Sequence, residues 1–371
     1  MLEMIMNGNT TLSGEVVKSF QMGSCPVVLT TGGNLYVNGN ANRLANTGVD
    51  INVLTTWKLI DTNVETFGFS GSSALLWRRS DKSWWAIGYF SYMFNALVTN
   101  VKVDVSSKCT AIPSDANVTK IAGGVNIFVI TDTGDLYGCG RNAWLQLGST
   151  ATNPTQNFIK LTNVTTNGVV DVISGGSAGF FIDKNKQYLL TGNDMYGVSG
   201  GPQYGNRPNG YVCAQGVDKI LDTNGTGVHI LRGDKLSSTG IQYYGQLGDG
   251  VNGGDNSGNY RTSWFDHPGV YSNMVTAPYG LFAKAPDGWY FTGRLPIYNA
   301  QSYTVYTTLT KMDTSDFSPD CVFVNSPSSD LQIMWDKGKL FFRGATHTYK
   351  IPGYTSTPQL NWVELPLTGI V

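Results

Sequence analysis

Charged side chains are scarce in this chain of 371 residues. Asp, Glu, Lys and Arg together make up 14% of it, whereas they make up about 25% of an average soluble domain. The formal net charge is −1 and no block of Lys and Arg occurs. A nucleic-acid backbone is bound by a basic surface, so we expect no nucleic-acid partner. The surface must be built largely from Asn, Thr, Ser and Gly.

Long apolar runs are also missing. A membrane-spanning helix needs roughly 18 or more consecutive apolar residues, and no such stretch occurs, so we expect no membrane insertion. The first residues, Met1 to Asn7, show neither a basic segment nor a long apolar run, and therefore do not indicate a secretory signal. We expect the chain to be made in the cytoplasm.

Residues that bind metals or form disulfides are few. The five cysteines are odd in number and widely spaced, which indicates small buried residues in a reducing compartment. His229, His267 and His347 lie far apart in the sequence, and we expect each to be a half-buried residue with a polar tip. We predict no metal site and no cofactor.

A short phrase recurs instead, with nearly constant spacing. Its clearest copy is Thr133-Gly134-Asp135-Leu136-Tyr137-Gly138-Cys139-Gly140. The seven copies end at Gly39, Gly88, Gly140, Gly192, Gly240, Gly293 and Gly344, so the gaps run from 48 to 53 residues. A fixed period of this size indicates a repeat architecture.

Each unit indicates β-strands. Apolar runs rich in Val, Ile, Phe and Tyr alternate with Gly and Asp turns, which predicts strand, strand, hairpin and strand. A further strand precedes most units, as at residues 158–161. Four strands in about 51 residues are the content of one propeller blade. We predict an all-β fold, a seven-bladed β-propeller with four-stranded blades.

The two ends of the chain are predicted to close the ring. The last strand, within residues 361–367, occupies the position that precedes a unit, and its continuation is residues 15–18. We therefore expect these two segments to be neighbours, with the N- and C-terminal strands fastening the ring. Residues 1–14 fall outside the repeat and are predicted to form an arm or an extra edge strand, while residues 15–371 form the propeller.

Two copies of the repeat continue into a Gln-Leu-Gly element, at Gln146-Leu147-Gly148 and at Gln246-Leu247-Gly248. With the preceding Gly-x-Leu-Tyr-x-x-Gly phrase, this resembles the repeat of the regulator of chromosome condensation family, over nearly the whole chain. The resemblance implies a seven-bladed propeller that binds proteins. Relatives include a nuclear exchange factor and a secreted β-lactamase inhibitor, and similar propellers occur among bacteriophage virion proteins.

Two segments invite a chemical interpretation. Residues 175–179 match the Gly-x-Ser-x-Gly nucleophile elbow, but that motif needs a following helix and the next residues indicate a strand. Residues 249–259 are rich in oxygen ligands without matching a calcium loop. A flexible loop is the favoured interpretation, and a bound cation is the alternative. We nominate no catalytic residue.

Aromatic residues outside the repeat positions are the candidate binding surface, because connectors lie on surfaces and Tyr and Trp are common in protein interfaces. The alternative is that these residues cap the blade core beneath long loops. The candidates are Tyr92, Phe94, Tyr243, Tyr244, Tyr260, Trp264, Tyr298 and Tyr303.

Three functions are compatible with this sequence. The first is a non-enzymatic binding or structural propeller in a bacteriophage virion, as a tail or capsid decoration whose partners are other virion proteins, a host-surface receptor or a glycan. The second is a soluble, cytoplasmic protein-interaction module, such as an inhibitor or an exchange-factor-like regulator. The third, an enzyme acting on glycans, needs a pair of carboxylates that the sequence does not single out, so we predict no enzymatic activity.

Overall fold

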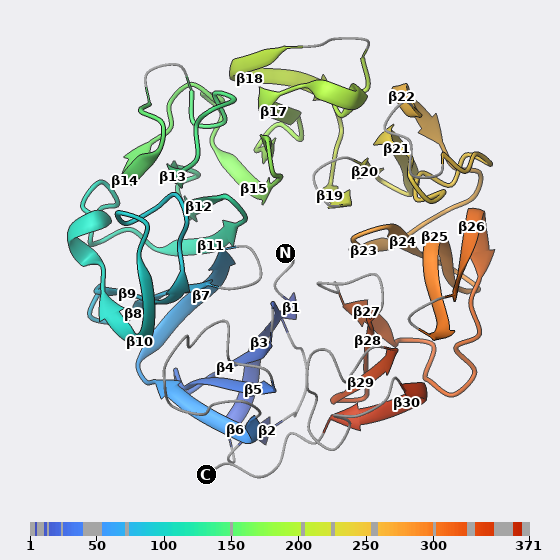
Figure 1. Ribbon diagram of the computed structural model, residues 1–371, viewed down its shortest axis with the longest axis horizontal. Helices are drawn as coiled ribbons and strands as arrows, with labels where there is room; N and C mark the ends of the chain where they lie inside the picture. The colour runs from blue at the N-terminus through green and yellow to red at the C-terminus, as the bar shows by residue number, and fades with distance from the viewer. Residues whose placement is uncertain are drawn as a thin grey trace.

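Seven antiparallel sheets are arranged as a ring in the computed structural model, with the first strand of each sheet toward the centre (Figure 1). The structure describes residues 4–5, 11–12, 15–23, 25–39, 54–70, 74–148, 151–201, 205–223, 227–253, 259–299, 302–324, 331–344 and 359–365. Helical structure in these ranges is limited to two short 3₁₀ turns, η2 (Ser106–Lys108) and η3 (Met195–Gly197). The protein is therefore a seven-bladed β-propeller, as the repeat predicts.

The first four blades follow one another along the chain, and each is given from its inner to its outer strand. Blade 1 consists of β3 (Glu15–Met22), β4 (Pro26–Thr30), β5 (Leu35–Gly39) and β6 (Leu54–Asp61). Blade 2 consists of β7 (Val64–Ser70), β8 (Ala74–Arg79), β9 (Trp84–Tyr89) and β10 (Val98–Asp104). Blade 3 consists of β11 (Val118–Gly123), β12 (Asn126–Thr131), β13 (Leu136–Gly140) and β14 (Thr155–Lys160). Blade 4 consists of β15 (Val169–Ser174), β16 (Ala178–Asp183), β17 (Tyr188–Asn193) and β18 (Asn206–Ala214).

The last three blades have the same order. Blade 5 consists of β19 (Lys219–Thr223), β20 (Gly227–Arg232), β21 (Lys235–Ile241) and β22 (Tyr260–Asp266). Blade 6 consists of β23 (Asn273–Ala277), β24 (Gly280–Ala285), β25 (Gly288–Asn299) and β26 (Ser302–Lys311). Blade 7 consists of β27 (Val322–Val324), β28 (Leu331–Asp336), β29 (Lys339–Gly344) and β30 (Gln359–Leu365). The strand that the sequence places before each unit is the outer strand of the preceding blade.

The repeated glycine lies at or near the end of the third strand in every blade except blade 6, where β25 continues beyond it. In blades 2 to 7 its backbone has a positive φ. Gly140 has a φ of 121° and Gly192 a φ of 92°. A Cβ atom at either position would lie 2.5 Å from a backbone carbonyl oxygen, of Val125 or of Ser177. Only glycine adopts this conformation readily and allows the approach, which explains why the residue recurs.

Threonine hydroxyls join successive blades next to this glycine. Thr191 of β17 donates a hydrogen bond to the carbonyl of Gln146 in the preceding blade, at 2.6 Å. Thr239 of β21 and Thr292 of β25 make the equivalent bonds at 2.9 and 2.8 Å. The acceptors lie in the loops between the third and outer strands, so these loops are held by the next blade.

The hydrophobic core is divided into clusters between neighbouring blades. The cluster that closes the ring contains Val17 and Phe20 of β3 together with Leu331 of β28 and Leu365 of β30. The two ends of the propeller therefore meet through side-chain packing, while β3 pairs with β4 and β30 pairs with β29 within their own blades. Residues 366 and 367 of the predicted closing segment lie outside the described residues.

Two short strands precede the repeat. β1 (Met4–Ile5) and β2 (Thr11–Leu12) both pair antiparallel with β3, and β1 lies toward the centre of the ring (Figure 1). The division into an arm of residues 1–14 and a propeller of residues 15–371 stays a prediction.

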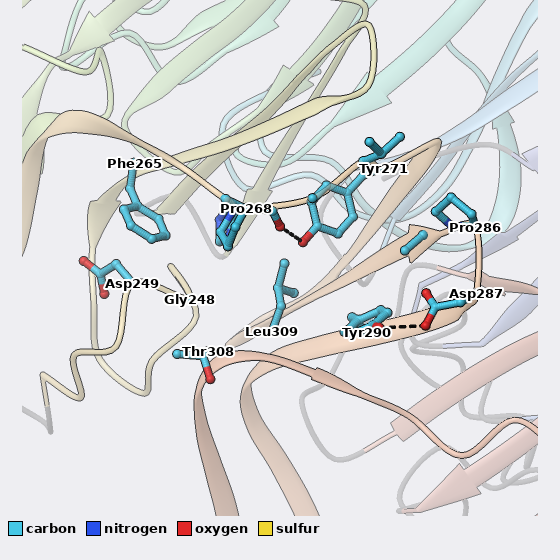
Figure 2. Close-up of a pocket in the computed structure, with 14 residues that line it drawn as sticks. Gly248, Asp249, Phe265, Pro268, Tyr271, Pro286, Asp287, Tyr290, Thr308 and Leu309 are labelled. Atoms are coloured by element: carbon cyan, nitrogen blue, oxygen red, sulfur yellow. Dashed lines mark hydrogen bonds between the residues drawn. The ribbon is translucent and has the colours of Figure 1, made fainter.

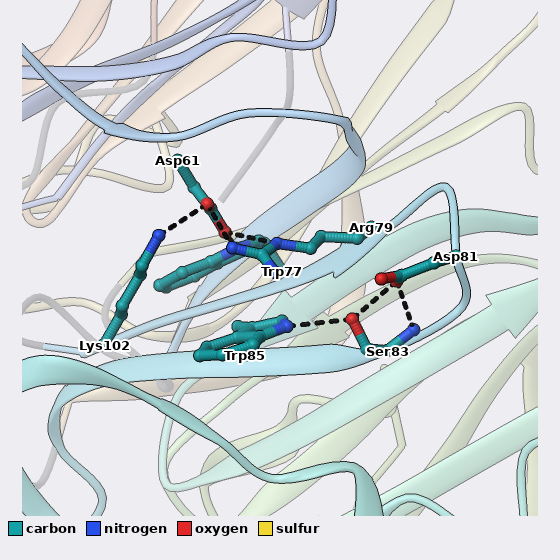
Figure 3. A network of polar contacts seen from close by, with 7 residues as sticks. All are labelled: Asp61, Trp77, Arg79, Asp81, Ser83, Trp85 and Lys102. Carbon is teal, nitrogen blue, oxygen red and sulfur yellow. Dashed lines mark hydrogen bonds and ion pairs between the residues drawn. The ribbon is translucent and has the colours of Figure 1, made fainter.

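A buried carboxylate connects blade 1 to blade 2 (Figure 3). Asp61, whose side chain is 1% exposed, accepts hydrogen bonds from Nε1 of Trp77 at 2.6 Å, Nε of Arg79 at 2.8 Å and Nζ of Lys102 at 2.8 Å. The guanidinium of Arg79 also lies 4.2 Å from the ring centre of Trp85. Burial alone would raise the pKa of Asp61, but the bonds from Arg79, Lys102 and Trp77 lower it to about 2. The carboxylate is therefore ionised and saturated with donors.

Candidate functional site

An aromatic residue lies four positions after the repeated glycine in blades 2 to 5. These residues are Tyr92, Trp144, Tyr196 and Tyr244. All of them lie between the third and the outer strand of their blades. Because equivalent loops of a propeller lie on one face of the ring, the repeat itself places aromatic rings along that face.

Five tyrosines from blades 4, 5 and 6 come together on this face. We call Tyr196, Tyr243, Tyr244, Tyr260 and Tyr279 the tyrosine patch. The ring centres of Tyr244 and Tyr279 are 5.1 Å apart, while those of Tyr243 and Tyr279 and those of Tyr196 and Tyr260 are 6.4 Å apart. These separations are typical of interacting aromatic rings.

Local hydrogen bonds hold the loops that carry these rings. Tyr196 lies in η3 with a φ of 69° and a ψ of 17°, a left-handed conformation that is uncommon for a residue with a side chain. The preceding turn is fixed by the side chain of Asn193, whose Oδ1 accepts a bond from the backbone N–H of Met195 at 2.8 Å. In blade 5, Oε1 of Gln246 accepts a bond from the N–H of Tyr244 at 2.8 Å. The Gln-Leu-Gly element thus positions an aromatic residue.

The ring contacts divide the patch into the pair Tyr196 and Tyr260 and the group of Tyr243, Tyr244 and Tyr279. Tyr243 interacts electrostatically with a residue of each. Burial, together with the neighbouring Tyr196 and Tyr279, raises the pKa of Tyr243. The guanidinium of Arg294 lies 5.3 Å from the ring centre of Tyr244, within the range of a cation–π interaction. Tyr260 is 37% exposed. The patch therefore combines phenol rings with the guanidinium of Arg294.

The structure brings together only some of the residues nominated from the sequence. Tyr243, Tyr244 and Tyr260 belong to the patch. Tyr92 lies apart, with the guanidinium of Arg141 5.6 Å from its ring centre. Tyr298 and Tyr303 lie on β25 and β26, and their side chains are outside the described part of the structure.

Of the nominated residues, Phe94 is buried and Trp264 is half-buried. Phe94 is 4% exposed and packs against Phe90 and Phe158, with ring centres 5.2 and 6.2 Å away. Trp264 packs on the core cluster of blades 4 to 6, with its ring centre 6.1 Å from that of Tyr188. The packing of Phe94 is that of a residue which caps the core, whereas Trp264 packs on the core with part of its ring accessible.

Two residues of the patch, Tyr196 and Tyr279, were not predicted from the sequence. Tyr196 could have been found from the position four residues after the repeated glycine. Tyr279 lies in the tight turn between β23 and β24, where the equivalent turn of blade 3 consists of Gly124 and Val125. An aromatic residue in a turn that otherwise contains small residues is the signal that could have identified it.

Two of the segments considered for chemistry lie wholly or partly in the described residues. Ser177 lies between β15 and β16, so a strand follows the Gly-x-Ser-x-Gly motif. Asp249 accepts hydrogen bonds from Gln242 and Arg261, at 2.5 and 2.8 Å, and residues 254–258 of its loop lie outside the described residues. His347 also lies outside them.

Within the described residues, no group of three or more His, Cys, Asp and Glu side chains is placed to hold a metal ion. No helix in these residues has the length and apolar character needed to cross a membrane.

The fold is shared with solved propellers of the RCC1 type. Yeast RCC1 (Prp20), in a structure with Kap60, has a TM-score of 0.71 and 13% identity over 93% of this chain and 85% of its own. Prp20p from Saccharomyces cerevisiae gives 0.72 and 13%, over 98% and 90%. Human WBSCR16 gives 0.70 and 14%, over 90% and 94%. At such identities the likeness concerns the fold alone.

No protein-family model matches the chain, and no curated protein matches it.

Proposed function

We propose that the protein is a non-enzymatic interaction propeller that binds a protein partner through the tyrosine patch. The observation that supports this is the convergence of five tyrosines from three consecutive blades on one loop face, beside the guanidinium of Arg294. Tyr and Arg are enriched at the centres of protein interfaces, because their rings and planar groups bury a large area and still form hydrogen bonds.

The structural neighbours support the same class of function. One solved structure describes yeast RCC1 (Prp20) bound to Kap60, and another describes the binding of Prp20p to Gsp1p and histones. We extend only the general property, protein binding by a propeller of this type, to this chain. The soluble regulator or inhibitor is therefore favoured over the virion component, although a virion role stays a prediction that the experiment below tests.

Site-specific crosslinking tests the proposal. A photoreactive phenylalanine analogue placed at position 243 should capture one protein at a stoichiometric level in the native source of the chain. The matched control is position 89, because Tyr89 is half exposed and lies on a different blade. A capsid or tail protein as the captured partner would support the virion role, whereas a soluble cellular protein would support a regulator or inhibitor.

The captured partner then allows a quantitative test. The double variant Tyr243→Ser/Tyr279→Ser should weaken its binding by about 30-fold or more, the effect of removing an interface hot spot. Tyr89→Ser should change the affinity by less than about twofold, as expected for a residue outside the contact. Equal affinities for the wild-type protein and the double variant would overturn the proposal.

A further inference from the structure

Blade 5 has polar residues at a position where the residues of every other blade are apolar. The residue two places before the repeated glycine pairs with a residue of the second strand, and in blade 5 this pair is Ser238 and His229. The corresponding pairs are Val27 and Val37, Leu76 and Ala86, Phe128 and Gly138, Phe180 and Leu190, Phe282 and Phe291, and Ile333 and Phe342. A polar pair thus replaces an apolar one in a single blade.

A third residue continues the departure. His267 follows β22 and donates its backbone N–H to the carbonyl of Leu236. The residues that make the equivalent backbone bond in blades 2, 3 and 6 are Val105, Leu161 and Met312. His229, Ser238 and His267 are all buried. Because buried polar groups are unfavourable without partners, a polar row here needs an explanation that the repeat does not supply.

The three side chains form one hydrogen-bonded row. Oγ of Ser238 lies 2.7 Å from Nδ1 of His229 and 2.7 Å from Nε2 of His267. Burial lowers the pKa of His229 to about 3 and that of His267 to about 4. Both rings are therefore neutral at pH 7, and each carries one N–H.

The row has a preferred direction. Nε2 of His229 is buried without a hydrogen-bond partner among the described residues. A buried N–H without a partner is rarer than a buried acceptor without one, so the proton of His229 is assigned to Nδ1, which donates to Ser238. The hydroxyl of Ser238 then donates to Nε2 of His267, which leaves the proton of His267 on Nδ1.

The row ends at a groove between blades 5 and 6. The cavity has a volume of about 430 Å³, and its lining includes His267, Phe265, Leu309 and Gly248. Gly248 faces the free edge of the imidazole, since a Cβ there would lie 2.7 Å from Cε1 and 3.3 Å from Nδ1 of His267. In the described residues Nδ1 has no hydrogen-bond partner. The N–H donor is thus held at an apolar cavity of the size that small ligands occupy.

The charged groups of the groove are already paired. Asp249 and Asp287 lie on opposite sides of it, with Leu309 between them (Figure 2). Asp249 binds Arg261 at 2.8 Å, and Asp287 binds Lys311 at 2.7 Å. A cation would find no unpaired carboxylate, and an anion would lie beside two carboxylates. The lining therefore favours an uncharged ligand.

We propose that the groove between blades 5 and 6 is a second binding site, for a small, uncharged, mainly apolar molecule with a carbonyl oxygen that accepts a hydrogen bond from Nδ1 of His267. Phe265 and Leu309 contact the apolar body of the ligand. Ser238 and His229 are positioning residues, because they fix which nitrogen of His267 carries the proton. This site is separate from the tyrosine patch and does not depend on the function proposed for it.

Three aromatic probes of similar size test separately whether the ligand needs a carbonyl oxygen and whether it must be uncharged. Acetophenone carries a carbonyl, toluene lacks one, and benzoate is anionic. In titrations of the full chain at millimolar concentrations, the range expected for ligands of this size, acetophenone should bind saturably and more tightly than toluene, and benzoate should bind least. Leu309→Trp, which fills the groove, should abolish the binding of all three probes.

The hydrogen bond is tested by His267→Phe, which keeps a ring but removes the donor. This variant should lower the affinity for acetophenone by about 3- to 10-fold, the worth of one neutral hydrogen bond, and leave that for toluene unchanged. If the variant does not fold, the imidazole ¹⁵N signals of the wild-type protein provide the same test, since acetophenone should shift the Nδ1 signal of His267 and toluene should not. Acetophenone binding that persists in Leu309→Trp, or that leaves Nδ1 unshifted, would overturn the proposal.

Discussion

Aromatic and cationic side chains come together in two regions of the molecule, the junction of blades 1 and 2 and the tyrosine patch of blades 4 to 6. The two regions differ in whether a buried carboxylate lies among these side chains. At the junction, the buried carboxylate of Asp61 accepts hydrogen bonds from Trp77, Arg79 and Lys102, and Arg79 packs on the ring of Trp85. In the patch, Tyr243 and Tyr279 meet edge to face, and the cation beside them, Arg294, lies against the ring of Tyr244. Aromatic and cationic residues therefore mark a structural joint when a buried anion saturates them, and a candidate interface when none does.

The largest expected effect is at the junction. Asp61→Ala leaves Arg79 and Lys102 without their buried anion, so we expect it to lower the free energy of unfolding by about 3–5 kcal/mol, as for a broken buried ion pair. Urea denaturation measures this. Asp81→Ala is the matched control, because Asp81 is exposed and bonds only to the nearby Ser83 in the described structure. If both variants lost the same free energy of unfolding, the buried carboxylate of the junction would stabilise the protein no more than an exposed one, and the comparison would fail.

The pH dependence of this loss has a defined sign. The folded-state pKa of Asp61 is about 2, below its ordinary value of 3.8, so its contribution to stability is complete above about pH 4 and is lost as the pH falls toward 2. The difference in unfolding free energy between the wild-type protein and Asp61→Ala should therefore shrink over this interval.

An effect of intermediate size is expected for the threonine hydrogen bond that holds the loop of Tyr244 in the tyrosine patch. Thr292→Val keeps the shape of the side chain but removes the hydroxyl that donates to the carbonyl of Gly245, next to Tyr244. We expect a loss of about 1 kcal/mol, the worth of one buried hydrogen bond, and a weaker affinity for the partner, because the loop of Tyr244 loses an anchor. Thr310→Val, at an exposed position of β26, should change neither measurement.

The smallest effect concerns the loop that carries Tyr196. In blade 3, Nδ2 of Asn142 donates to the carbonyls of Gly148 and Ala151, at 2.9 Å each. Blade 4 has Asp194 at this position. Its Oδ2 has no hydrogen-bond partner among the described residues and lies 3.6 Å from Arg207. Burial raises the pKa of Asp194, and the bonds from Ser199 and the charge of Arg207 offset this only in part.

Asp194→Asn restores the donor of blade 3 and should raise the free energy of unfolding by about 0.5 kcal/mol at pH 7. Because a raised folded-state pKa makes the ionised form unfavourable, stability falls as the pH rises above about 4. The advantage of the variant should therefore be larger at pH 7 than at pH 4, opposite in sign to the trend at Asp61. Denaturation curves at the two pH values measure it, and a variant that is less stable at pH 7 would contradict the argument.

Much of the fold could be predicted because its determinants are local. The glycine of the third strand recurs because a positive φ and a nearby carbonyl exclude a side chain, as at Gly140 and Gly192. Alternation of apolar strands and turns repeats with it. These features depend on residues close together in the sequence, so a single unit shows them and seven units confirm them.

The candidate site was predicted only in part, because burial depends on neighbouring blades. Phe94 and Tyr92 are two residues apart, yet Phe94 is buried against Phe158 of the next blade while Tyr92 lies beside Arg141. Tyr279 is in a turn of blade 6 and contacts rings of blade 5. No local pattern distinguishes these cases.

The sequence by itself determined the number of blades, their strands and the turns between them, because these follow from short-range backbone geometry and the apolar pattern. Only the tertiary structure decided which polar and aromatic side chains meet. His229 and His267 are 38 residues apart, and the pairing of the strands within blade 5 brings one to each side of Ser238.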